Sequence, residues 1–335
     1  MMKLTNPVKY FPIEKPIYEV APHLKPFGMD LGGGDQDKKI FQFDSLFPLA
    51  RESKLKAHAE RISKYYLNNA PVKHNEILSL FLIDRLVMEW PQFFTVRLAQ
   101  NKILLQCHLT KEELIFDMNG RYRDEESKSA LYYLDAIDAL VMQVQEDIAW
   151  VVKETDGKDS DNCDGLKILH VMSPSHWSPE VKFNQSFFNV HAPIPGVEKL
   201  NKSANQMVDA MINKGPFLRM VWSFVTDQNF NHHPDAPKGT DPKQWKGRSF
   251  DLENKPENPF DLRVERQITW GFKELNAALF TIRISFLEGQ EVKANKEWRE
   301  LLSGAIESMS PASLEYKGLS HCKNELLNWL LTESV

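Results

Sequence analysis

Four strand-like segments in the second half of the chain constrain its fold more than any other feature. They are LKILHVMS at 166–173, LRMVWSFVTD at 218–227, LRVERQITW at 262–270 and ALFTIRISFLE at 278–288. Such runs, rich in aliphatic and aromatic residues, are typical of buried strands. Because helical patterns stand before and after this block, the sequence predicts an α+β fold built on a mainly antiparallel sheet.

The helical patterns lie on both sides of the strands. Apolar spacing predicts helices over 45–66, 75–90 and 131–152, and the runs FFTVRL and KILLQCHL predict a hairpin between the second and third of these. The 131–152 prediction rests on steps of three and four residues between Leu134, Ile137, Val141, Val144, Ile148 and Val151. Two further helices are predicted near 292–308 and 312–333, the second with Ser310 as N-cap and Pro311 in its first turn.

The remaining segments suggest one domain preceded by an arm. Residues 1–45 are rich in proline and are expected to form an extended N-terminal arm, with residues 46–335 as a single domain. The charged segment DGKDSDNCDG at 156–165 predicts a surface excursion. The polar, proline-broken stretch 228–261 predicts a long functional or variable loop.

Composition excludes several classes of partner. A net charge of −5 offers no basic footprint for nucleic acid or anionic lipid, and the apolar 131–152 stretch carries too many acidic residues to span a membrane. The N-terminus carries prolines where a signal peptide has its apolar core. Cys107, Cys163 and Cys322 lie far apart, which favours a reducing cytoplasm and cannot supply the four thiolates of an iron–sulfur cluster.

His191 is the first candidate site residue. It stands in Val190-His191-Ala192-Pro193-Ile194-Pro195, where each proline fixes its own φ and extends the residue before it. A stiffly held neutral imidazole is what an axial metal or haem ligand requires. A turn histidine bonded to a carbonyl explains the same pattern, so both interpretations stay open.

Arg266 and Arg219 are the second and third candidates. Strand alternation puts Arg266 among Leu262, Val264, Ile268 and Trp270, and Arg219 lies in the apolar run LRMVW. A guanidinium at such a position needs an anion, because an unpaired buried charge is costly. A ligand carboxylate or an internal Asp or Glu would serve.

Taken together, the motifs resemble those of the haem-dependent oxidative N-demethylase α-subunit family. The resemblance runs from about residue 10 to 330 and rests on an ordered set of motifs. They are YFPIEKPIYEVAPHLKPF near the N-terminus, VQED at 144–147, SHWSPEVK at 175–182, HAPIP at 191–195, Arg219 with Trp222, LRVERQ at 262–267 and FTIR at 280–283.

This resemblance implies a PAS-like antiparallel sheet with surrounding helices and a helical C-terminus, holding haem b without a covalent bond. It implies that His191 is the iron ligand and that Arg219 and Arg266 are propionate or pocket partners. It also implies O₂-dependent oxidation of a small secondary amine such as dimethylamine. Electrons would come from separate reductase subunits that carry the flavin and the iron–sulfur cluster.

Two alternatives remain at this stage. The first is a haem or gas-sensing module without catalytic activity, because one fold serves many functions. The second is a protein without haem, in which Arg266 pairs internally and His191 is a turn residue. Haem content separates the second from the others, and amine-dependent release of formaldehyde separates the enzyme from the sensor.

Overall fold

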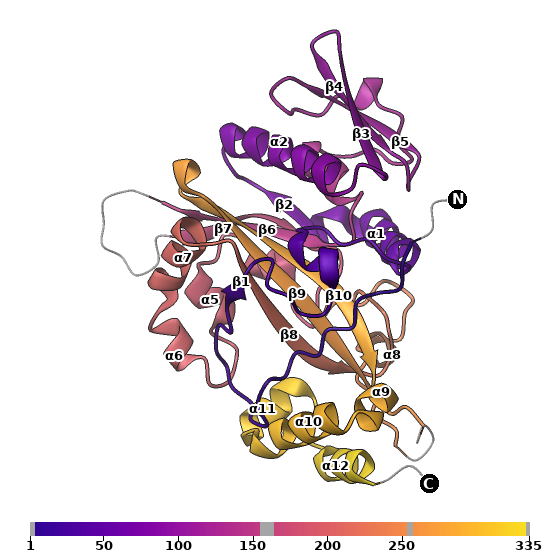
Figure 1. Ribbon diagram of the computed structural model, residues 1–335, viewed down its shortest axis with the longest axis vertical. Helices are drawn as coiled ribbons and strands as arrows, with labels where there is room; N and C mark the ends of the chain where they lie inside the picture. The colour runs from indigo at the N-terminus through magenta and orange to yellow at the C-terminus, as the bar shows by residue number, and fades with distance from the viewer. Residues whose placement is uncertain (1–3, 155–163, 253–256, 333–335) are drawn as a thin grey trace.

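The computed structural model describes residues 4–154, 164–252 and 257–332, and its centre is a seven-stranded antiparallel sheet. The strand order is β1-β8-β9-β10-β6-β7-β2 (Figure 1). These strands span Lys25–Pro26 (β1), Tyr66–Asn68 (β2), Asp147–Lys153 (β6), Asp164–His170 (β7), Phe217–Val225 (β8), Asp261–Phe272 (β9) and Ala277–Glu288 (β10). A smaller sheet comprises Phe94–Ala99 (β3), Lys102–Cys107 (β4) and Glu112–Asp117 (β5). The α+β prediction, its four strands and the hairpin are confirmed.

Helices surround the large sheet. They are Phe47–Arg61 (α1), Val72–Glu89 (α2), Ala136–Val141 (α3), Pro179–Lys182 (α4), Phe187–His191 (α5), Glu198–Asn201 (α6), Ala204–Asn213 (α7), Pro242–Trp245 (α8), Gly289–Ala294 (α9), Lys296–Ser308 (α10), Pro311–Lys317 (α11) and Lys323–Leu331 (α12). Short 3₁₀ turns lie at Gly34–Lys38, Ile62–Lys64, Asp124–Glu126 and Lys273–Leu275. Among the described residues, no helix has the length and apolar character needed to cross a bilayer.

The two faces of the large sheet have different surroundings. On one, here called the helix face, Leu262, Val264 and Ile268 of β9 are buried, and the two largest apolar clusters pack there against α1–α3 and α10–α12. On the other, here called the cavity face, β9 presents Arg263, Glu265, Gln267 and Thr269. Helix α7 packs on this second face through Val208, Met211 and Ile212. The alternation predicted for β9 is therefore present, with both of its faces covered.

The predicted helix over 131–152 is wrong for most of its length. Only α3 is helical, with Asp135 as N-cap accepting hydrogen bonds from the Ile137 and Asp138 amides. The following turn is held by Glu146, whose carboxylate accepts a hydrogen bond from the Gln42 amide, and β6 then begins at Asp147. Strand β6 lies between β10 and β7 and is buried on both faces. A doubly buried strand carries a continuous apolar run, which periodicity alone cannot distinguish from a helix.

The C-terminal helices are more divided than predicted. Ser310 is the N-cap of α11 and accepts a hydrogen bond from the Ser313 amide, as expected, but α11 ends at Gly318, whose φ of 76° lies in the left-handed region. The predicted 312–333 helix is therefore two helices, α11 and α12. The 292–308 segment is divided in the same way by Asn295, which ends α9 and caps α10.

The N-terminal arm is irregular apart from β1 and one 3₁₀ turn, and it runs past the C-terminal helices to the β8 edge of the sheet (Figure 1). The Tyr18 amide donates a hydrogen bond to Ser308 Oγ of α10 at 2.8 Å. Loop 228–261 contains only the short helix α8 among its described residues. The surface excursion predicted at 156–165 lies almost entirely outside the described residues, as does Cys163.

Candidate functional site

A cavity of about 720 Å³ lies on the cavity face of the large sheet. Strands β6–β10 form its floor, and its walls come from segments around α4–α7, from loop 228–261, from α11 and from arm residues 10–31. This volume is within the range of small-molecule and cofactor sites. Apolar and aromatic side chains line much of it, among them Trp177, Phe187, Trp222 and Phe280.

Strand β9 supplies a fixed ion pair to the cavity floor. Glu265 accepts a hydrogen bond from Gln267 Nε2 at 2.9 Å and lies 3.4 Å from Arg263 Nε. Arg263 is fully buried and also donates 2.6 Å hydrogen bonds to the carbonyls of Phe230 and Ser173. Each of the three nitrogens of this guanidinium therefore has a partner, and Glu265 presents a carboxylate whose position is fixed from two sides.

His191 is the last residue of α5 and lines the cavity. Its Nδ1 lies 2.7 Å from the Phe187 carbonyl oxygen, one helical turn back, so Nδ1 carries the proton and Nε2 keeps its lone pair. Burial lowers the pKa of His191 to about 4, and the charges of Arg219 and Lys182 add to this effect. At neutral pH the residue is therefore a neutral imidazole with a free Nε2, held by a helix rather than by the proline turn that follows it.

Arg219 lies in the same cavity, on β8 opposite Gln267 of β9. Its Nε is buried and has no hydrogen-bond partner among the described residues. Burial lowers the pKa of Arg219, and the charge of Glu265 opposes that shift only in part. The structure thus brings His191 and Arg219 together beside one ligand-sized space.

Arg266 points away from that space, toward the helix face. It donates hydrogen bonds to the carbonyls of Asp37 at 3.2 Å, Lys39 at 2.8 Å and Ile40 at 3.4 Å. Residues 37–40 belong to the N-terminal arm, so this guanidinium ties the arm to the sheet. The structure separates Arg266 from His191 and Arg219, and the anion expected from sequence is replaced by backbone carbonyls.

Three further cations line the cavity that the sequence did not single out. Lys182 Nζ lies 4.7 Å from the Trp177 ring centroid, and burial lowers its pKa to about 8. Arg248 comes from loop 228–261, and Lys317 is the last residue of α11. Burial and then the charge of Arg248 lower the pKa of Lys317 to about 7. Only Lys182 falls within a motif noted in the sequence, SHWSPEVK. The other two lie in polar segments whose composition indicates a surface position.

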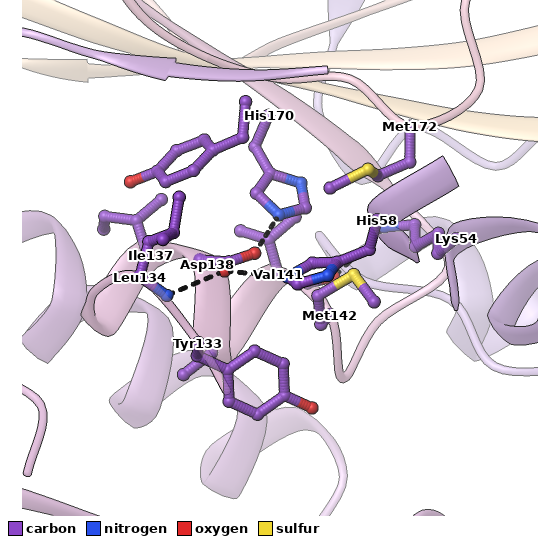
Figure 2. A network of polar contacts seen from close by, with 12 residues as sticks. Lys54, His58, Tyr133, Leu134, Ile137, Asp138, Val141, Met142, His170 and Met172 are labelled. Atoms are coloured by element: carbon purple, nitrogen blue, oxygen red, sulfur yellow. Dashed lines mark hydrogen bonds and ion pairs between the residues drawn. The ribbon is translucent and has the colours of Figure 1, made fainter. Parts of the chain in front are cut away.

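A separate buried polar network lies on the helix face, where α3 meets β7. Figure 2 shows Asp138 between His170 and His58, whose Nε2 atoms lie 3.0 and 3.3 Å from its two carboxylate oxygens. The Leu134 amide donates a third hydrogen bond to Asp138. Burial alone would raise the pKa of Asp138, but these hydrogen bonds outweigh it and hold that pKa well below its usual value. This network joins α3 to the sheet and does not line the cavity.

The cavity therefore has the features of a site for a largely apolar ligand that carries an anionic group and a centre able to accept a nitrogen donor. The neutral His191 offers one donor nitrogen, and the unpartnered Arg219 offers a charged donor for an anion. Among the described residues no cluster of three His, Cys, Asp or Glu side chains is arranged to hold a bare metal ion. A metal ion in this cavity would need most of its ligands from a cofactor, such as the four nitrogens of a porphyrin.

Comparison with known protein families assigns most of the chain to one family. The family model for haem-dependent oxidative N-demethylase, alpha subunit-like, matches residues 34–327 of the 335-residue chain. The match includes the whole large sheet except β1, together with His191, Arg219 and all three further cations.

Proposed function

The chain belongs to the haem-dependent oxidative N-demethylase alpha-subunit-like family, and from this premise we propose that its cavity holds haem b non-covalently and serves the O₂-dependent demethylation of a small secondary amine. The family name gives haem dependence, an oxidative N-demethylase activity and a place as one subunit among others. The haem type, the amine and the electron donor are the proposed part. We also propose a single PAS-like domain over residues 46–335 and a cytoplasmic location.

The observation that carries the proposal is the state of His191. Its Nδ1 is occupied by the Phe187 carbonyl and its Nε2 is free at the cavity wall, which is the arrangement that would let this imidazole hold a haem iron. Arg219 and Lys182 are suited to bind the haem carboxylates, because both are cationic and line the same part of the cavity. Bound haem would supply iron(II) chemistry with O₂ and the oxidation of the N-methyl group.

The residues of this chain would bind and orient the amine. Among the described strand residues that form the cavity floor, Glu265 is the only carboxylate, and its oxygens can accept a hydrogen bond from the N–H of a protonated amine. The aromatic walls can contact the N-methyl group and keep bulk water away from it. The arm residues 10–31 complete this exclusion of water by closing one side of the cavity.

The overall reaction defines what the partners must provide. One secondary N-methylamine, one O₂, two electrons and two protons give the demethylated amine, formaldehyde and one water. The chain has three cysteines and cannot hold a four-cysteine iron–sulfur cluster alone. We therefore assign delivery of the two electrons to separate reductase subunits with flavin and an iron–sulfur cluster.

The test is a visible absorption spectrum of the full chain expressed with ample haem, before and after addition of dithionite. We expect a stoichiometric Soret band that shifts on reduction and is lost in His191→Ala. His176→Ala is the matched control, because His176 also lines the cavity but its Nε2 is engaged by the Lys246 carbonyl at 2.8 Å. This control is expected to keep the band.

Turnover is measured as formaldehyde formed from dimethylamine with O₂ and a chemical reductant. A colourless protein after haem reconstitution would refute the cofactor assignment. A haem-loaded protein that releases no formaldehyde from any small secondary amine would refute the enzymatic assignment and favour a haem or gas-binding role.

A further inference from the structure

The cavity has two cationic ends. Arg219 on β8 pairs with Gln267, whereas Ser223 on β8 pairs with Arg263, four residues further along both strands. Four residues of strand correspond to about 13 Å. His191 feels the charges of Arg219 and Lys182 and lies with them at the first end. Toward the second end, Lys317 donates to the carbonyl of Trp222, the residue before Ser223, and Arg248 donates to the carbonyl of Tyr316, the residue before Lys317.

Charge balance shows that the second end lacks an anion. Glu265 is matched by Arg263, with which it forms the ion pair described above. On the arm side of the cavity Lys25 pairs with Glu14, and Lys15 lies near Glu19 in the sequence. Among the described residues, no carboxylate lies within ion-pair distance of the four other cations, Lys182, Arg219, Arg248 and Lys317. The two propionates of a haem would compensate two of these four groups, which leaves Arg248 and Lys317 without an anion. Burial lowers the pKa of Lys317 to about 7, so this amine would become fully protonated when a carboxylate binds beside it.

Arg248 carries the clearest sign of a missing partner. Its Nε is buried without a hydrogen-bond partner, and its Nη1 makes a long 3.3 Å contact to the Tyr316 carbonyl oxygen. Lys317 beside it donates to the Trp222 carbonyl and lies 4.6 Å from the Trp222 ring centroid. Two adjacent cations whose nearest partners are carbonyls and rings form a site for a carboxylate.

We propose that Arg248 and Lys317 form a subsite for the carboxylate of the substrate, and that the amine oxidised by this protein is an N-methyl amino acid. The proposal rests on the proposed function and narrows its substrate class. In an N-methyl amino acid the ammonium and the carboxylate are joined through one carbon. The ammonium would contact Glu265 while the carboxylate reaches the cations near it, since Glu265 lies opposite Val221 of β8 and Lys317 donates to the carbonyl of the next residue, Trp222. Dimethylamine has only the positive group and would leave this end uncompensated.

The test uses the full chain and compares N-methylglycine with N-methylglycinamide, which has the same skeleton without the negative charge. Binding is measured by isothermal titration calorimetry and, in the haem-loaded protein, by the shift of the visible spectrum. We expect N-methylglycine to bind at least about tenfold more tightly than the amide, as one charge-assisted contact implies. Arg248→Gln and Lys317→Met should abolish this preference without changing the haem content.

Lys243→Gln is the matched control, because Lys243 is an exposed lysine of the same loop and does not line the cavity. It should keep the preference. Thermal melts confirm that each variant is folded.

Three results would overturn the proposal. In the first, the wild-type protein binds both compounds equally. In the second, the preference persists in the folded Arg248→Gln and Lys317→Met variants. In the third, Arg248→Gln loses haem, which would assign this end to a propionate. A chain that takes up no haem refutes the proposed function instead, and calorimetry on that same protein still reports whether N-methylglycine binding depends on Arg248.

Discussion

Replacing Arg219 by methionine tests whether this guanidinium binds a ligand or stabilises the fold. Its buried Nε has no partner within the described protein, and no carboxylate there lies within ion-pair distance of it. A charge-assisted hydrogen bond to a haem carboxylate contributes about 1.5–3 kcal/mol. At 1.4 kcal/mol per tenfold change, Arg219→Met should weaken haem binding by about 10- to 150-fold.

The same substitution should leave the haem-free protein as stable as before or more stable. Methionine removes an uncompensated charge and retains most of the apolar contacts of the side chain, and replacing poorly compensated buried charge by apolar groups is often neutral or stabilising. The prediction therefore has opposite signs for two measurements on one variant. Urea unfolding of the haem-free protein gives the first, and the rate of haem transfer to a scavenging protein gives the second.

Arg266→Met is the matched control. Arg266 makes three hydrogen bonds to arm carbonyls on the helix face, and its loss leaves those carbonyls without donors. We expect the free energy of unfolding to fall by about 2–4 kcal/mol while the folded variant binds haem as the wild type does. The reasoning is refuted if Arg219→Met destabilises the haem-free protein and keeps its haem affinity.

Three further predictions concern stability. Asp138→Asn should lower the free energy of unfolding by about 2–4 kcal/mol at pH 7; because the folded pKa of Asp138 is depressed, its contribution is lost as the pH falls below about 4, so urea titrations of wild type and variant should converge in acid. Lys317→Met should raise the free energy of unfolding of the haem-free protein above that of the wild type, and this gain should be larger at pH 7 than at pH 10. The reason is that the folded pKa of Lys317 is about 7, so between pH 10 and pH 7 the proton is taken up mainly by the unfolded wild-type chain, which it stabilises. A gain of equal size at both pH values would contradict this. Gly271→Ala should lower the melting temperature, because the new Cβ would lie 2.1 Å from the Ile212 carbonyl oxygen of α7, and an unchanged melting temperature would show that α7 can move away without cost.

The sequence was sufficient for strands β7–β10 and for the α11 cap, although β6, which lies between β7 and β10, was predicted as a helix. The four strand segments, the hairpin and the Ser310 cap all have local signals, namely β-branched runs, turn residues and an N-cap serine. It failed at 131–152 because β6 is covered on both faces and so has no polar alternation. It also could not divide the C-terminal helices at Asn295 and Gly318.

Site residues were harder to predict because both faces of β9 are covered. Alternation correctly separated Arg266 from Arg263 and Glu265, but it does not say which face borders a cavity. Arg266 was the charged residue that interrupted the apolar face of β9, but its guanidinium anchors the arm. Arg248 and Lys317 approach the cavity from loop 228–261 and α11, and no local pattern marks them, since their position depends on tertiary packing.

The arm residues 10–31 line the cavity, yet the family match begins at residue 34. One wall of the site is thus made by a stretch of chain that does not belong to the matched core, and only the two residues of β1 join it to the sheet as a strand. Mutation can alter the shape and polarity of that wall while β6–β10 and His191 stay as they are. Ligand preference can therefore diverge at the arm positions that face the cavity alone, whereas Ile13 belongs to the buried cluster beneath α10–α12 and Phe11 stacks on Trp298.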